Sequence, residues 1–444
     1  MNLNEFREKD ARHYLHPFTD HSQLDTHGVY WIKSGQGCFV IDEHDQKLLD
    51  GLAGLWCVNV GYGCQAIIDA VTEQMHRLPY YPSFFNSATE PGVLLAEWLA
   101  QHTPPGLNRM LFCNSGSEAN DTALKVIAQY FNRTGKPRKR KMLTRYFSYH
   151  GVTLGAGSLT GLSHCHEPFG LPLPDFIKVP APWAYEAKTN LNPEAFGQAV
   201  LKETEAIILR EDPETIAAFF VEPIQGAGGV IVPPPGYLQG LRQMCRQYGI
   251  LFVADEVITG FGRLGDWFAS HLWKLEPDLL CVAKGITSGY LPLGATILSD
   301  PISDVIRTSG PLSHGFTYSG HPTCAAAALA NLHYIEEQNL IPHVRDHVGP
   351  YLQLKLATLQ THPAVDEVRG YQLMAAIQLR PPTDPTAPPI GVEVARHIRK
   401  AGVIVRGLGN CLAIAPPLII SRQEVDLLLE GVKKGLDTWL NTLE

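Results

Sequence analysis

A lysine and an aspartate stand at the ends of two apolar runs and carry groups suited to carbonyl chemistry. Lys284 follows the apolar run 279–283 and enters a turn rich in Gly and Ser, and Asp255 follows the run 250–254. A lysine amine can attack an aldehyde to form a Schiff base, and a carboxylate can keep a ring nitrogen protonated. The alternative for Lys284 taken alone is an exposed lysine at a strand end, with its charge in water.

Both residues are expected at the same edge of a sheet, because each follows an apolar run of strand length. In open α/β sheets, ligands bind beside the carboxyl ends of the strands. A lysine and a carboxylate that face each other there suit pyridoxal 5'-phosphate, which needs a lysine for its aldehyde and an anion for its ring nitrogen. The pair therefore predicts this cofactor.

Three residues between a predicted strand and a predicted helix could hold an anion. Ser115 and Ser117 supply hydroxyl groups, and Gly116 lets the backbone approach closely. The free amides at the start of a helix favour negative charge, so this segment could bind a phosphate. The alternative is that Ser117 merely caps its helix, as serines commonly do.

Two further strand ends carry side chains that could contact a flat ring. Tyr149 and His150 precede Gly151, and the Tyr149 face could stack on a planar group. Glu222 ends another apolar run and could hydrogen-bond the substituents of a ring seated at the sheet edge. Ordinary packing at a strand end is the alternative for Tyr149 and His150.

Apolar runs alternate with helical patterns, which is typical of a largely parallel sheet with crossover helices. The predicted strands are 109–113, 141–145, 217–221, 250–254, 279–283 and 295–298, and the predicted helices include 117–131, 236–248, 324–338 and 422–443. We therefore predict an α/β fold with a large domain over residues 51–320. Residues 1–50 and 321–444 together would form a smaller α+β domain. Proline-rich stretches at 168–182 and 380–389 are expected to be a surface excursion and a loop.

Composition excludes several classes of function. The net charge of -8 argues against a nucleic-acid partner, because phosphate backbones select basic surfaces. No segment approaches the roughly 20 apolar residues of a membrane span, and residues 1–5 lack the pattern of a signal peptide. Nine scattered cysteines without CxxC spacing indicate reduced thiols. These features predict a cytoplasmic protein without a membrane partner.

The trio His164, Cys165 and His166 has side chains that bind metals. Adjacent positions in an irregular loop rarely converge on one ion, so we predict no metal site.

Seven motifs resemble those of the class III aminotransferases, pyridoxal-phosphate enzymes of fold type I, and occur in the family's order. They occupy residues 55–63, 114–118, 149–151, 222–226, 255–263, 283–285 and 314–322. Within this family the chain is most similar to the ω-amino acid and amine:pyruvate transaminases. The motifs span most of the chain, and they imply the family's fold, with a large domain that binds the cofactor.

The resemblance implies a role for each matching residue. Lys284 would hold the cofactor and move a proton at the substrate Cα, while Asp255 would keep the pyridine nitrogen protonated. Thr317 would reach the phosphate of the neighbouring subunit, which implies a homodimer with shared active sites and leaves a tetramer open. The residues implied at the cofactor are Ser115, Gly116, Ser117, Tyr149, His150, Glu222, Asp255, Val257, Lys284 and Thr317.

The same resemblance implies a pocket that accepts pyruvate, which has a carboxylate, and an amine that can lack one. Arg406 matches the family's mobile arginine and would bind the carboxylate, with Gly407 and Gly409 giving the backbone latitude. For a plain amine, Arg406 would swing out and leave an apolar pocket. The side chains expected to line that pocket are Trp56, Phe84, Phe85, Tyr149 and Ala227, although each aromatic is also compatible with core packing.

We therefore predict a transaminase that moves an amino group from an ω-amino acid or amine to pyruvate. A dedicated putrescine or diamine:pyruvate transaminase is the close alternative, because the motif at 55–63 occurs on that branch too. A dialkylglycine decarboxylase of the same fold fits that motif less well. A non-catalytic binding module would require the loss of a catalytic group, and both Lys284 and Asp255 are present.

Overall fold

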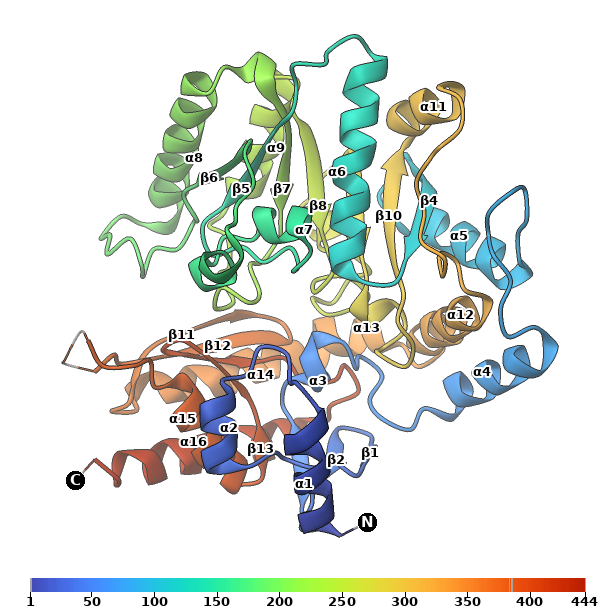
Figure 1. Cartoon of the computed structure of the whole chain (residues 1–444). Coiled ribbons are helices and arrows are strands. Elements are labelled where there is room, and N and C mark those ends of the chain that lie inside the picture. The colour runs from blue at the N-terminus through green and yellow to red at the C-terminus, as the bar shows by residue number, and fades with distance from the viewer. Residues whose placement is uncertain (1, 383, 385, 444) are drawn as a thin grey trace.

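Seven strands form the central sheet of the molecule (Figure 1). The computed structural model describes residues 2–382, 384 and 386–443. The strands are β4 (Leu107–Cys113), β5 (Lys141–Arg145), β6 (Phe176–Val179), β7 (Ile216–Val221), β8 (Leu251–Asp255), β9 (Leu279–Val282) and β10 (Gly294–Ser299). Their order is β4-β10-β9-β8-β7-β5-β6, and β10 alone runs antiparallel to its neighbours in this sheet. The predicted mainly parallel α/β sheet is confirmed.

The six predicted strands are all present, with ends that differ by at most two residues. Strand β7 shows why they were predictable, because its six residues are all buried, as in a strand covered on both faces. Strand β6 was not predicted. It lies inside the proline-rich stretch 168–182, and it is a short edge strand that pairs with β5 alone. Such a strand lacks the long apolar run that identifies a central one.

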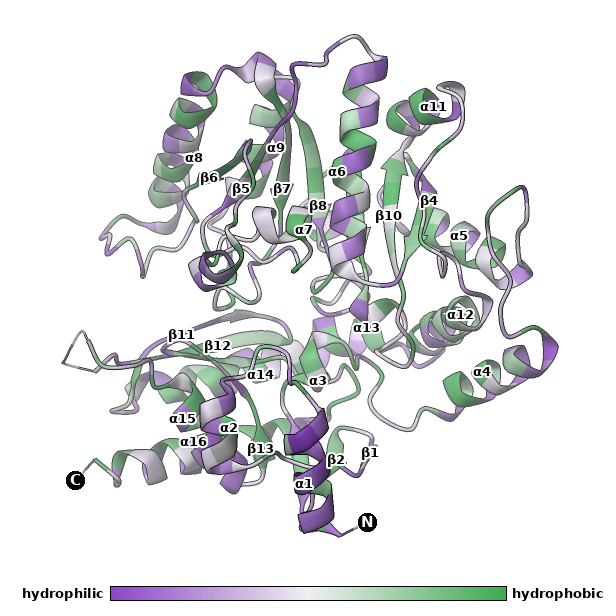
Figure 2. Ribbon diagram, in the orientation of Figure 1, coloured by the Kyte–Doolittle hydropathy of each residue, from purple (hydrophilic) through white to green (hydrophobic). Residues whose placement is uncertain are grey.

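Helices cover both faces of this sheet. Helix α6 (Gly116–Arg133) packs on one face, whereas α8 (Pro193–Arg210) and α9 (Tyr237–Gln247) contribute to the core on the other. Figure 2 shows that the strands between them are strongly hydrophobic. The predicted helices at 117–131, 236–248, 324–338 and 422–443 correspond to α6, α9, α12 (Pro322–Glu337) and α16 (Arg422–Leu440).

The remaining helices are shorter or lie outside this sandwich. They are α1 (Leu3–His13), α2 (His21–His27), α3 (Ala53–Trp56), α4 (Gln65–Arg77), α5 (Glu90–His102), α7 (Leu154–Leu159), α10 (Ala269–Leu272), α11 (Asp300–Thr308), α13 (Leu340–Pro342), α14 (Gly349–Ala357) and α15 (Gly391–Lys400). Within the described residues, no helix has both the length and the apolar character that a membrane crossing requires.

Two small sheets lie below the central sheet in the view of Figure 1. One contains β1 (Ser34–Gln36), β2 (Phe39–Ile41), β3 (Lys47–Asp50) and β13 (Val403–Ile404), and the other contains β11 (Val365–Tyr371), β12 (Met374–Leu379), β15 (Cys411–Ile414) and β14 (Arg406–Leu408). The parallel pairing of β3 with β13 joins the N-terminal segment to the C-terminal third. The division into domains at residues 50 and 320 stays a prediction.

The proline-rich stretch 380–389 lies between β12 and α15. Its positions 383 and 385 lie outside the described residues. The other residues of the stretch form neither helix nor strand, in agreement with the predicted loop.

Candidate active site

The carboxyl ends of β4, β5, β7, β8 and β9 face a cavity of about 1820 Å³. The structure brings twelve of the fifteen predicted site residues to it. They are Trp56, Ser115, Gly116, Ser117, Tyr149, His150, Glu222, Ala227, Asp255, Val257, Lys284 and Arg406. Phe84, Phe85 and Thr317 are not among the residues that line the cavity.

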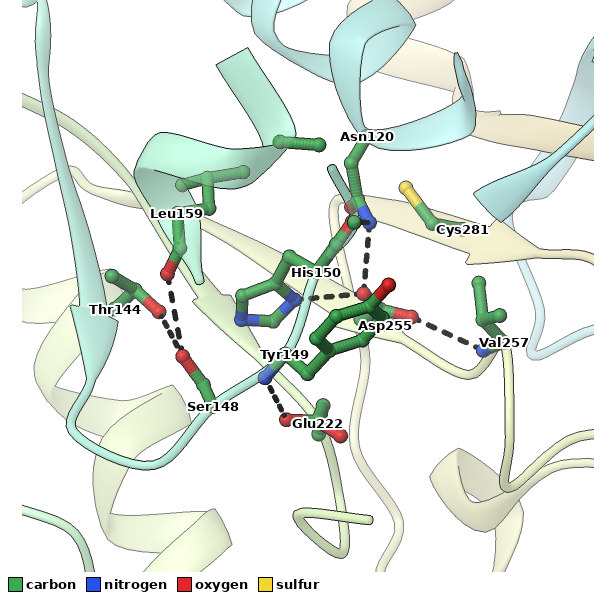
Figure 3. Close-up of polar contacts among 12 residues, drawn as sticks. Asn120, Thr144, Ser148, Tyr149, His150, Leu159, Glu222, Asp255, Val257 and Cys281 are labelled. Atoms are coloured by element: carbon green, nitrogen blue, oxygen red, sulfur yellow. Dashed lines mark hydrogen bonds and ion pairs between the residues drawn. The ribbon is translucent and has the colours of Figure 1, made fainter. Parts of the chain in front are cut away.

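Asp255 ends β8 and is held by three contacts (Figure 3). Its Oδ2 accepts a hydrogen bond from Asn120 Nδ2 at 2.9 Å and lies 2.7 Å from His150 Nδ1. Its Oδ1 accepts from the Val257 amide at 3.1 Å. The carboxylate is therefore fixed in orientation at the cavity, with no lysine or arginine among its described ion-pair partners.

Asn120 is a part of this arrangement that the sequence did not reveal. It lies on α6 one turn after Gly116, is fully buried, and also donates to the carbonyl oxygen of His150 at 2.8 Å. The feature of the sequence that could have indicated Asn120 is that a polar residue stands on the apolar face of an amphipathic helix. By binding both His150 and Asp255, Asn120 fixes their relative position.

Lys284 follows β9 and lies at the same edge as Asp255, as predicted. Its φ of 50° is in the left-handed region, which residues other than glycine seldom adopt and which often occurs at functional sites. Burial lowers the pKa of Lys284, and the nearby Asp255 carboxylate opposes that effect. A lowered pKa makes the neutral, nucleophilic amine available closer to neutral pH.

The segment at the start of α6 has the groups that the predicted anion cradle requires. Ser115, not Ser117, caps the helix, because the Ser115 Oγ accepts from the Glu118 amide at 3.2 Å. The Ser117 Oγ accepts from the Val152 amide at 3.1 Å, which leaves its own proton free to donate. A side chain at Gly116 would lie 2.9 Å from Val257 Cγ1, so only glycine fits there. The amides of Gly116 and Ser117 precede the capped Glu118 amide, have no partner within the helix and are available for an anion.

Glu222 follows β7 and connects two loops at the cavity. Its Oε1 accepts from the Tyr149 amide at 2.9 Å, drawn in Figure 3, and its Oε2 accepts from the Gly226 amide at 2.9 Å. Burial raises the pKa of Glu222, although the nearby His150 opposes this. The carboxylate therefore positions the Tyr149 turn relative to the loop that contains Ala227.

Arg406 is the first residue of β14. It lines the cavity from the small sheet that contains β14, whereas Ser115 and Asp255 line it from the central sheet. Its guanidinium carbon lies 5.4 Å from the centre of the Trp56 ring, and burial lowers its pKa. Among the described side chains, none forms an ion pair with Arg406. Gly409 has a φ of 58° and open surroundings, whereas a side chain at Gly407 would collide with the backbone of Gly391, so Gly407 also permits close packing; the expected backbone latitude beside Arg406 stays a prediction.

Phe84, Phe85 and Thr317 lie together outside this chain's own cavity. A side chain at Gly315 would lie 2.8 Å from the Phe84 ring, which places that ring against the loop that leads to Thr317. The carbonyl oxygen of Thr317 accepts from the Tyr80 hydroxyl at 2.7 Å. The Phe85 side chain is 92% exposed.

The trio at residues 164–166 is used differently from a metal site. His166 is buried and its Nε2 lies 2.9 Å from the carbonyl oxygen of Gly157. His164 and Cys165 line the cavity. In the part of the chain that the structure describes, no group of three His, Cys, Asp or Glu side chains is arranged to hold a metal ion.

The lining of the cavity fits pyridoxal phosphate. A cradle of amides and hydroxyls at the start of α6 suits its phosphate, and the fixed carboxylate of Asp255 suits its ring nitrogen. The Lys284 amine, with its lowered pKa, suits its aldehyde. These groups come from different strands but meet at one edge of the sheet.

Comparison with known proteins identifies the family. The model of the family described as Aminotransferase class-III matches residues 21–436, which is most of the chain. The chain belongs to this family. Class III aminotransferases use pyridoxal phosphate, so the predicted family, fold type, enzyme class and cofactor are confirmed.

Relatives cover nearly the whole of this aminotransferase. The putrescine–pyruvate aminotransferase of Pseudomonas aeruginosa is 41% identical over 437 residues, which are 98% of this chain and 96% of the relative. The chloroplastic gamma aminobutyrate transaminase 3 of Solanum lycopersicum is 39% identical over 99% of this chain and 88% of its own. The crystal structure of an omega transaminase from Pseudomonas jessenii in complex with PMP superimposes with a TM-score of 0.94 at 39% identity, over 97% of each chain.

Proposed function

We propose that this aminotransferase moves an amino group from an ω-amino acid or amine to pyruvate, forming alanine by a ping-pong mechanism. The observation that carries the proposal is Arg406, a cation at the cavity with no carboxylate partner among the described side chains. A buried carboxylate requires such a partner. Pyruvate supplies a carboxylate, whereas a plain amine offers Arg406 no anionic partner.

The proposed roles of the other residues follow from their places in the cavity. The cofactor, when bound, supplies an electron sink for the carbon that loses its proton. Lys284 would remove a proton from that carbon and deliver it to the cofactor carbon that carries the aldehyde, and its lowered pKa suits both tasks. Asp255 holds the proton on the ring nitrogen, while Asn120 and His150 hold Asp255 in place. Tyr149 and Val257 flank the ring, and Glu222 fixes the Tyr149 turn.

A homodimer would complete the site. Thr317 and Phe85 are exposed and lie outside the cavity of their own chain, so each can reach the cavity of a second copy. In this proposal Thr317 binds the partner's phosphate group, as the family resemblance implies. Phe84 and Phe85 would then close the partner's substrate pocket rather than their own.

A diamine is the second candidate for the donor. The printed name of the relative from Pseudomonas aeruginosa includes putrescine, and Asp20 and Glu186 line the cavity of this chain. Either carboxylate suits the second ammonium group of a diamine.

The cytoplasmic location stays a prediction.

The test is a panel of donors with the purified holoenzyme. Putrescine, 4-aminobutyrate and 1-phenylethylamine are each incubated with pyruvate or 2-oxoglutarate, and alanine or glutamate is measured. We expect alanine from pyruvate with at least one donor, and far less glutamate from 2-oxoglutarate. No alanine with any donor would refute the proposal, and carbon dioxide released from 2-aminoisobutyrate would favour the decarboxylase.

A further inference from the structure

One guanidinium lies directly behind the wall of the cavity and contacts it at several points. Arg369, on β11, donates from Nε and Nη2 to the carbonyl oxygen of Gly229 at 2.8 and 2.6 Å. Its guanidinium carbon lies 4.9 Å from the centre of the Trp183 ring, and its Nη1 pairs with Glu367 at 2.9 Å. The Arg369 side chain is only 9% exposed, so these contacts are largely shielded from water.

The groups around Arg369 come from separate parts of the fold. Trp183 follows β6 and Gly229 follows β7, so both lie in loops that leave the central sheet. Gln378 on β12 and Cys411 on β15 belong to the sheet that includes β14. The Nη2 of Arg369 lies 3.3 Å from Gln378 Oε1 and 3.5 Å from Cys411 Sγ. Trp183, Gln378 and Cys411 all line the cavity, so one side chain joins both of its walls.

The loop that accepts these hydrogen bonds forms the wall at Ala227. Ala227 and Gly228 line the cavity immediately before Gly229. A side chain at Gly228 would collide with the carbonyl oxygen of Phe147, so the loop is tightly packed. Val230 follows with a φ of 53°, which β-branched residues rarely adopt. A strained segment keeps its shape only while its surroundings hold it.

We propose that Arg369 is a positioning residue that sets the distance between the wall at Ala227 and the strand of Arg406, and so selects the size of the amine substituent. The inference rests on the proposed function. Arg369 does not line the cavity, and its effect passes through Gly229 and Trp183. The reacting groups lie on other strands and keep their positions when it is lost.

Lysine cannot replace Arg369 in this role. The planar guanidinium reaches one carbonyl with two nitrogens while it stacks on the Trp183 ring. A lysine ammonium is a point charge on a flexible stem and cannot keep both contacts in one geometry. Arg369→Lys therefore retains the positive charge but no longer holds Gly229 and Trp183 in place.

The experiment compares two amines of different size in Arg369→Met, Arg369→Lys and the wild-type holoenzyme. The donors are sec-butylamine and 1-phenylethylamine, each with saturating pyruvate, and kcat and KM are measured separately. We expect the ratio of the kcat/KM values for the two amines to change by about tenfold or more relative to the wild type. One methylene group more or less in an apolar pocket changes kcat/KM on this scale. The change should appear in KM. Equal losses for both amines would overturn the proposal.

A matched control is Arg242→Met. Arg242 pairs with Asp278 at 2.9 Å, lies 5.9 Å from the centre of the Phe252 ring, is 13% exposed and does not line the cavity. Arg242→Met removes an ion pair and an aromatic contact like those of Arg369, but at a place that does not adjoin the cavity. The ratio between the two amines should stay within about twofold in this variant, as expected for a site without shared contacts.

A second measurement does not depend on turnover. Hydrogen exchange of residues 226–230 in the resting holoenzyme should be faster in Arg369→Met than in the wild type and unchanged in Arg242→Met. Unchanged exchange in Arg369→Met would overturn the proposal by itself. A wild-type enzyme that forms no alanine from any donor would refute the proposed function instead, and the exchange experiment would still test Arg369.

Discussion

The guanidinium of Arg406 rests over the ring of Trp56, with its central carbon 5.4 Å from the ring centre. A cation over an aromatic face contributes about 0.5–2 kcal/mol, depending on how far it is desolvated. A carboxylate in a shielded pocket binds an arginine more strongly than an aromatic ring does. We therefore expect an acceptor's carboxylate to compete with the Trp56 ring for Arg406.

The first prediction concerns the two half-reactions. Arg406→Ala should slow the half-reaction with pyruvate by about 100-fold or more, because losing one partner of a shielded ion pair costs roughly 2–5 kcal/mol. The half-reaction with 1-phenylethylamine should change far less, since that donor has no carboxylate. Stopped-flow absorbance of the bound cofactor measures both rates. Equal losses with both substrates would show that Arg406 does not distinguish them.

The second prediction concerns Asp255. Asp255→Asn keeps the shape of the side chain and removes the charge that faces the cavity. We expect kcat to fall by about 100- to 1000-fold, the range found when a fixed electrostatic contact to the reacting group is lost. The affinity for the cofactor, measured by fluorescence titration, should change by much less. A variant that loses cofactor and activity in parallel would assign Asp255 to binding alone.

The third prediction concerns the shared site. Lys284→Ala and Thr317→Ala chains should each be impaired as homodimers, but a mixed dimer should regain activity. In that dimer one site combines an intact Lys284 with the intact Thr317 of the other chain. Subunits are mixed at increasing ratios, and alanine formation is measured. If Thr317 serves the site of its own chain, mixing restores nothing.

The fourth prediction concerns pH. The Lys178 ammonium on β6 donates to the carbonyl oxygens of Ser158, Leu159 and Thr160 at 2.7, 2.9 and 2.7 Å. Burial lowers the pKa of Lys178 to about 7, below the ordinary 10.5. Between these values the unfolded chain holds a proton that the folded chain has released, so stability rises with pH over this interval.

Comparison with Lys178→Met isolates this effect, because methionine does not titrate. The Tm of the wild type relative to the variant should increase from pH 7 to pH 10, measured by thermal unfolding of the holoenzyme. Lys433→Met, at an exposed lysine that pairs with Asp437 at 2.8 Å, serves as the control and should show no such trend. A constant difference for Lys178→Met would mean that the three carbonyls keep the lysine protonated throughout.

Much of the fold was predictable because its central strands are continuous apolar runs. Strand β7 is buried along its whole length, and such a run is visible without any knowledge of its partners. Strand β6 was not predictable in this way, because a short edge strand depends on β5 for its hydrogen bonds and has only one residue fully buried. The central strands of this sheet can therefore be predicted from the sequence, whereas its edge strand β6 is recognised only in the three-dimensional structure.

The candidate site shows the same limit. Lys284 and Asp255 could be located because each follows an apolar run, and strand ends of that kind converge. Asn120 and Arg369 could not, because their importance lies in contacts with residues more than 100 positions away. Phe84 and Phe85 were expected in the apolar pocket that the family resemblance implies, but the sequence of one chain does not specify which copy's cavity a side chain faces, and neither residue lines the cavity of its own chain.

The close packing of Gly407 against Gly391 has a kinetic consequence. Because the backbone of Gly407 packs directly on that of Gly391, we expect any alternation of Arg406 between the two substrates to occur by rotation of its side chain rather than by movement of β14. Rotation of a single side chain is generally faster than the collective movement of loops and domains. We therefore expect the exchange between an acceptor that has a carboxylate and a donor that lacks one to require no slow movement of the backbone.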